Sequence, residues 1–65
     1  MSKQAWDIIA QLEEQYAGDD EVLEIIENAK KDIEYIEKQE AAGNYTGQPA
    51  EGKAEELRGF LEEWY

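Results

Sequence analysis

The sequence predicts an all-α fold, a three-helix bundle in which the central helix is the longest. Apolar residues recur at three- and four-residue spacing in three separate stretches, which is the period of a helix with one buried face. Short breaks that contain glycine divide the stretches. Because each apolar face must be covered, three helices around a shared core form the simplest single domain over residues 1–65. The alternative is a helical hairpin whose third helix completes a homodimer.

The first helix is expected over residues 3–17. Ser2 can cap it, because a serine oxygen accepts a hydrogen bond from the free N–H groups of a first turn. Gly18 is expected to be the residue that follows the helix. The apolar stripe of this helix consists of Ala5, Ile8, Ile9, Leu12 and Tyr16.

The second helix is expected over residues 20–42 and would be ~34 Å long at ~1.5 Å per residue. Asp19 or Asp20 can cap it, and their negative charge is favourable at a helix N-terminus. Its apolar stripe consists of Val22, Ile25, Ile26, Ala29, Ile33 and Ile36.

Two acid-first pairs at four-residue spacing are expected to brace this second helix. Glu27 would pair with Lys31, and Glu34 with Lys38. Such pairs each stabilise an exposed helix by ~0.2 to 0.5 kcal/mol. The bases would therefore support the helix without neutralising it.

The third helix is expected over residues 49–64. Gly43 and Asn44 form the stop signal before it, and Pro49 suits its first helical position, where no N–H is needed. Its apolar face consists of Ala50, Ala54, Leu57, Leu61 and Trp64.

Composition excludes several classes of protein. The 17 acids and six bases give a net charge of −11, so the chain should not bind nucleic acid directly and should attract basic surfaces. No apolar run approaches the ~20 residues of a membrane span, and the N-terminus lacks the order of a signal peptide. We therefore expect a cytoplasmic protein that does not contact a membrane.

The chain is not expected to be an enzyme. It contains no histidine and no cysteine, and catalysis near neutral pH needs a group that titrates or attacks there. Neighbouring glutamates diverge by 100° on a helix and do not form an acid–base dyad. Neither a calcium-loop spacing nor a Glu-x-x-His motif occurs, so no metal or other cofactor is expected.

The second helix carries a row of glutamates at three-residue spacing, interrupted by Lys30 and Lys31. Helical neighbours three apart lie ~5 to 6 Å from one another, and DNA carries one charge per ~1.7 Å of axis over both strands. The row can therefore imitate a phosphate track, although it winds around the helix. The competing interpretation is that glutamate simply forms helices well and keeps the protein in solution. The row consists of Glu21, Glu24, Glu27, Glu34, Glu37 and Glu40.

Aromatic residues suggest where contacts could be made. Tyr35 lies opposite the apolar stripe of its helix, and interfaces favour tyrosine as an anchor. We expect Tyr35 and the six glutamates to form the partner-binding surface. Trp6 and Trp64 are expected to complete the core.

These features predict a small acidic inhibitor or adaptor that docks on the basic nucleic-acid-binding surface of a partner protein. In size and charge alone, the chain is similar to small phage anti-defence proteins, including anti-CRISPR and anti-restriction proteins, which implies a DNA or RNA mimic. An antitoxin that binds a basic toxin would share these electrostatics. The alternative is a generic or designed helical interaction module, or a homodimer in contact through Ile33 and Ile36, whose acidity serves solubility.

Overall fold

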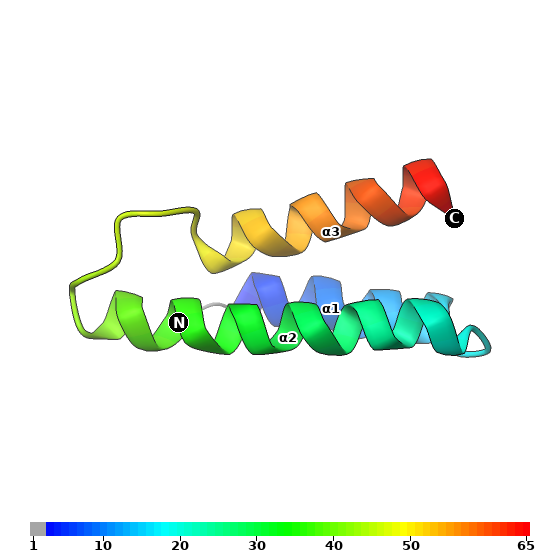
Figure 1. Ribbon diagram of the computed structural model, residues 1–65, viewed down its shortest axis with the longest axis horizontal. Helices are drawn as coiled ribbons and strands as arrows, with labels where there is room; N and C mark the ends of the chain where they lie inside the picture. The colour runs from blue at the N-terminus through cyan, green and yellow to red at the C-terminus, as the bar shows by residue number, and fades with distance from the viewer. Residues whose placement is uncertain (1–2) are drawn as a thin grey trace.

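Three helices lie side by side in the computed structural model (Figure 1), which describes residues 3–65. They are α1 (Lys3–Gln15), α2 (Asp20–Ala41) and α3 (Ala50–Trp64). The chain runs in one direction along α1 and α3 and in the opposite direction along α2. The longest dimension of the molecule is 37 Å, close to the ~33 Å that 22 helical residues span. The predicted all-α bundle with a long central helix is confirmed.

One apolar core joins all three helices, and α3 packs on α1 and α2 of its own chain. Ile33 and Ile36, which the homodimer alternative would use as a contact, are 0% and 6% exposed within the single chain. Among the described residues no polar or charged side chain is buried. The buried residues are Ala5, Ile8, Ile9, Leu12, Val22, Ile26, Ala29, Ile33, Ile36, Ala50, Ala54, Leu57 and Leu61.

The connection from α1 to α2 is longer than predicted, because α1 ends at Gln15 and not at residue 17. The Asp19 N–H donates to the Tyr16 carbonyl at 2.9 Å, which closes a turn without a left-handed residue, so Gly18 does not have the C-terminal role that we expected. Asp19 caps α2 as predicted, since its Oδ1 accepts from the Val22 N–H at 3.2 Å. The predicted cap by Ser2 lies outside the described residues.

Gly43 ends α2, as the sequence predicted. Its φ of 76° places it in the left-handed region, where a side chain is unfavourable. The Gly43 N–H donates to the Glu40 carbonyl at 3.1 Å, and the Asn44 N–H donates to the Gln39 carbonyl at 3.2 Å. This pair of hydrogen bonds is the Schellman motif, which satisfies carbonyl groups at the end of a helix.

Pro49 precedes α3 and does not occupy its first helical position, so that prediction is wrong by one residue. Its φ of −68° and ψ of 160° are extended, and its carbonyl accepts the Lys53 N–H at 3.0 Å. Pro49 is instead the N-cap residue of α3. An N-cap residue adopts non-helical angles and provides the first carbonyl acceptor of the helix.

Trp64 is not a core residue, contrary to prediction, since it is 67% exposed. Figure 1 shows α3 inclined away from α2 towards its C-terminus. The last turn of α3 therefore leaves the layer in which Leu61 is fully buried. Trp6 is half-buried against the core, as expected.

We predict that Gly43→Ala lowers the free energy of unfolding by about 1 to 2 kcal/mol, because alanine is strained at positive φ. Gly59→Ala is the matched control. A Cβ at Gly59 meets nothing within 4 Å, and alanine favours helix by about 1 kcal/mol over glycine. Urea unfolding followed by circular dichroism measures both. Equal effects of the two substitutions would contradict the assigned end of α2.

Candidate partner-binding surface

All seven residues of the predicted partner-binding surface lie on α2 outside the core. Glu37 is half-buried and the others are exposed, Tyr35 by 60%. They do not form one continuous face. The six glutamates fall into an N-terminal part at Glu21, a middle part at Glu24 and Glu27, and a C-terminal part beyond Lys31, which consists of Glu34, Glu37 and Glu40.

Lys30 organises the middle of the row. Its Nζ lies 3.0 Å from Glu27 Oε1 and 2.5 Å from Glu13 Oε2, so it joins α2 to α1. These two hydrogen-bonded carboxylates raise the pKa of Lys30 above its ordinary value of about 10.5. Lys30 thus takes the role that we had assigned to Lys31 in bracing α2.

The two predicted bracing pairs are wrong, because among the described residues neither Lys31 nor Lys38 has a carboxylate oxygen within 4.0 Å. Competition explains the absence of the Glu27–Lys31 pair, because Lys30, three residues after Glu27, binds the Glu27 carboxylate instead. The structure gives no comparable reason for the second pair. Of the six glutamates in the row, only Glu27 is neutralised by a base in residues 3–65.

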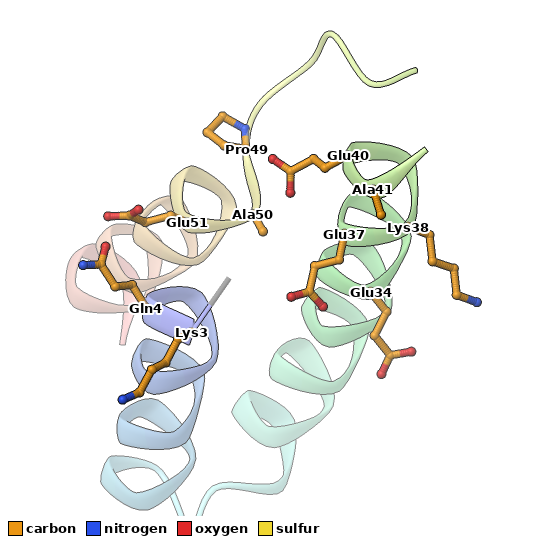
Figure 2. Close-up of a pocket in the computed structure, with 10 residues that line it drawn as sticks. All are labelled: Lys3, Gln4, Glu34, Glu37, Lys38, Glu40, Ala41, Pro49, Ala50 and Glu51. Atoms are coloured by element: carbon orange, nitrogen blue, oxygen red, sulfur yellow. The ribbon is translucent and has the colours of Figure 1, made fainter. Parts of the chain in front are cut away.

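The C-terminal part of the row lines an open groove, which we call the end groove, where α1 and α3 begin and α2 ends (Figure 2). Figure 2 shows Glu40 pointing towards Pro49 and Ala50 at the start of α3 and Glu37 pointing into the space between α2 and α1, whereas Lys38 points away. The groove residues are Lys3, Gln4, Glu34, Glu37, Lys38, Glu40, Ala41, Pro49, Ala50 and Glu51.

Glu37 has a partner within the molecule. The Trp6 Nε1–H donates to Glu37 Oε2 at 3.0 Å and so connects α1 with α2. An indole N–H is satisfied in this way when its ring is partly buried. Glu37 therefore has a structural role at the edge of the end groove, which its place in the row did not predict.

Tyr35 lies on another side of the bundle, beside a shallow hollow between the end of α2 and the loop before α3. Asp32 and Lys53 also line the hollow and pair there at 3.7 Å. Tyr45 from the loop packs against the core and forms part of the same hollow. Tyr35 is thus separated from Glu37 and the end groove.

An exposed aromatic cluster, formed by Phe60, Trp64 and Tyr65, was not among the predicted site residues. The Phe60 ring centroid lies 6.4 Å from those of Trp64 and Tyr65. The Tyr65 hydroxyl donates to Glu21 Oε1 at 2.7 Å, and this hydrogen bond is the main reason that the pKa of Tyr65 is raised above about 10. The four-residue spacing of Phe60 and Trp64 places the two rings side by side on one helix face. The same spacing is also found in a buried apolar stripe, so it does not show that the rings are exposed.

The sequence matches no protein-family model, and comparisons with curated proteins and with solved structures found no match. In residues 3–65, no three acidic side chains gather in an arrangement that could hold a metal ion. None of the helices described here is long and apolar enough to cross a membrane. The geometry of the surface is therefore the basis for a functional proposal.

We predict that Lys30→Gln lowers the melting temperature near pH 8 and that this loss shrinks as the pH rises above the ordinary lysine pKa of about 10.5. A lysine with a raised pKa in the folded state stabilises fully below its unfolded value of about 10.5, and the contribution is lost as pH rises through the folded value. Lys31→Gln, which changes charge equally, is the control. The role of Lys30 is refuted if both variants lose the same stability near pH 8.

Proposed function

We propose that this protein is a cytoplasmic inhibitor or adaptor that places the glutamate row of α2 on the basic nucleic-acid-binding surface of a partner protein, as a DNA or RNA mimic. The observation that carries the proposal is the lack of neutralisation along the row. Five of its six glutamates have no base within 4.0 Å in the described part of the chain. Of the bases that do pair, Lys30 contacts Glu27 of the row and Glu13 of α1. Lys53 contacts Asp32, and Arg58 contacts Glu55, both outside the row.

The shape of the bundle supports this use of charge. The row runs along α2, which extends over most of the 37 Å length of the molecule. From Glu21 to Glu40 it therefore offers carboxylates over roughly 28 Å, a distance comparable to about eight base pairs of DNA at ~3.4 Å per step. Lysine and arginine side chains that bind phosphates can contact carboxylates instead. Charge of this density would also accelerate encounter with a basic partner.

A second candidate function is a helical interaction module that binds through apolar contacts. The exposed cluster of Phe60, Trp64 and Tyr65 favours it, because large aromatic residues in contact with one another are typical interface anchors. In this case the acidity serves solubility and binding would depend little on salt. The two functions are therefore separated by the salt dependence of binding.

We predict that replacing Glu24, Glu34 and Glu40, which are exposed and have no base within 4.0 Å in the described residues, with glutamine weakens capture of the partner. The expected loss lies between about 3-fold and about 150-fold, on the basis of ~0.2 to 1 kcal/mol for each exposed ion pair. The protein is immobilised and exposed to a bacterial lysate, and the column is washed at low and then moderate salt. Mass spectrometry identifies retained proteins. Duplex DNA added as competitor should release the same partner from the unmodified protein.

The control variant neutralises the same number of charges on other helices, with Asp7→Asn, Glu14→Gln and Glu62→Gln. These residues are exposed and lie on α1 and α3. Capture should fall less in this control than in the α2 variant. A partner that is retained equally by all three proteins, or that resists both salt and competing DNA, would refute the mimic and favour the apolar interaction module.

A further inference from the structure

The aromatic cluster of Phe60, Trp64 and Tyr65 lies at the opposite end of the bundle from the end groove. Its residues are 44%, 67% and 51% exposed, respectively. The Phe60 ring lies beside those of Trp64 and Tyr65 at the C-terminal end of α3, and the Tyr65 hydroxyl contacts α2 through Glu21. The cluster is thus an ordered platform of ring faces on the surface.

Carboxylates surround this platform. Glu21 accepts the Tyr65 hydrogen bond at 2.7 Å, and the charges of Glu21 and Asp19 both raise the pKa of Tyr65. Glu62 and Glu63 directly precede Trp64 on α3 and are exposed. The nearest base along α3, Arg58, is held by Glu55 at 2.5 Å. The surroundings of the platform therefore favour a positively charged ligand.

We propose that the aromatic cluster, together with Glu21, binds an arginine side chain in a cationic segment of the protein partner. A guanidinium stacks on aromatic faces, is more weakly hydrated than an ammonium group and donates hydrogen bonds to a carboxylate as a second contact. Trp64 provides the best ring for such stacking. This inference rests on the proposed function and names a specific anchor for the partner, because Glu21 is also the first glutamate of the α2 row.

A second copy of the chain suits the cluster less well. It would bring its own net charge of −11 towards the acids around the platform. Three partly exposed rings also offer only a few hundred Å², on the order of half the ~800 Å² that each partner contributes to a stable interface. An added attraction is therefore needed, and a cationic partner provides it.

The test is an NMR titration of the full chain with hexa-arginine, and hexa-citrulline is the uncharged control of the same shape. The two tryptophans provide separate indole N–H signals. Trp6 donates to Glu37, whereas Trp64 is the ring expected to bind. The Trp64 signal should shift saturably with hexa-arginine and not with hexa-citrulline, and Trp6 should stay unchanged. Trp64→Leu should weaken binding about 2- to 5-fold at an exposed site.

Trp64→Leu should remain folded because the side chain is outside the core, and an unchanged Trp6 signal checks this. Glu21→Gln removes the charge while keeping the size of the side chain, and should also weaken binding of hexa-arginine. Asp7→Asn on the surface of α1 is its control, with the same change in charge. Binding that is equally sensitive to Asp7→Asn and Glu21→Gln would overturn the proposed site.

Other outcomes separate this inference from the proposed function. If amide signals around Glu24, Glu27 and Glu34 shift while Trp64 does not, the arginine site is overturned and the α2 surface remains supported. If hexa-citrulline shifts Trp64 as strongly as hexa-arginine, the cluster is an apolar surface and the arginine site is again overturned. A Trp64 signal that moves on dilution without peptide would identify a second copy as the occupant.

Discussion

The balance between a small apolar core and a large excess of negative charge governs this structure. Every helix carries more acids than bases, and the net charge is −11, so electrostatic repulsion opposes the packing that the core favours. The core opposes this repulsion with branched aliphatic residues at its centre, including Ile26, Ile33 and Leu61, all at 0% exposure. No buried charge or unsatisfied side chain weakens it among the described residues. The charge is tolerated because it stays entirely on the surface.

Two of the six bases are placed where they oppose repulsion between helices. Lys30 joins α2 to Glu13 of α1, and Lys53 joins α3 to Asp32 of α2. A base used in this way removes repulsion between two elements, whereas a pair within one helix supports that helix alone. The Trp6 hydrogen bond to Glu37 adds a second connection between α1 and α2. These contacts leave most of the α2 row without a counter-charge.

Periodicity predicted the core and the helices because burial follows the 3.6-residue repeat of a single helix. The aliphatic residues of the three stripes are buried with one exception, Ile25, which is half-buried. Features that depend on the angle between helices were not predictable in this way. Trp64 has the right phase for the core and is nevertheless exposed, because α3 is inclined away from α2. No repeat within one helix encodes that inclination.

The same distinction applies to the candidate site: features set within one helix were predictable, and contacts between helices were not. The exposure of the glutamates follows from their phase on α2, and the sequence alone was sufficient to predict it for all but Glu37. The partner of each glutamate depends on which residue of another helix lies opposite. Trp6 reaches Glu37 across 31 residues of sequence, and Tyr65 reaches Glu21 across 44. Such contacts are set by the packing of the bundle, which a one-dimensional pattern does not contain.

The two ends of the α2 row differ in a way that bears on specificity. A row of exposed carboxylates attracts any basic surface, and its field is screened beyond the Debye length of about 8 Å at physiological salt. Charge alone therefore gives fast encounter and little discrimination between basic partners. Aromatic rings act only at contact and depend on shape, so they discriminate where charge does not. By holding Tyr65 against Glu21 at 2.7 Å, the fold joins the aromatic cluster to one end of the row. In the proposed function, long-range attraction by the row and short-range selection by the cluster therefore meet at Glu21.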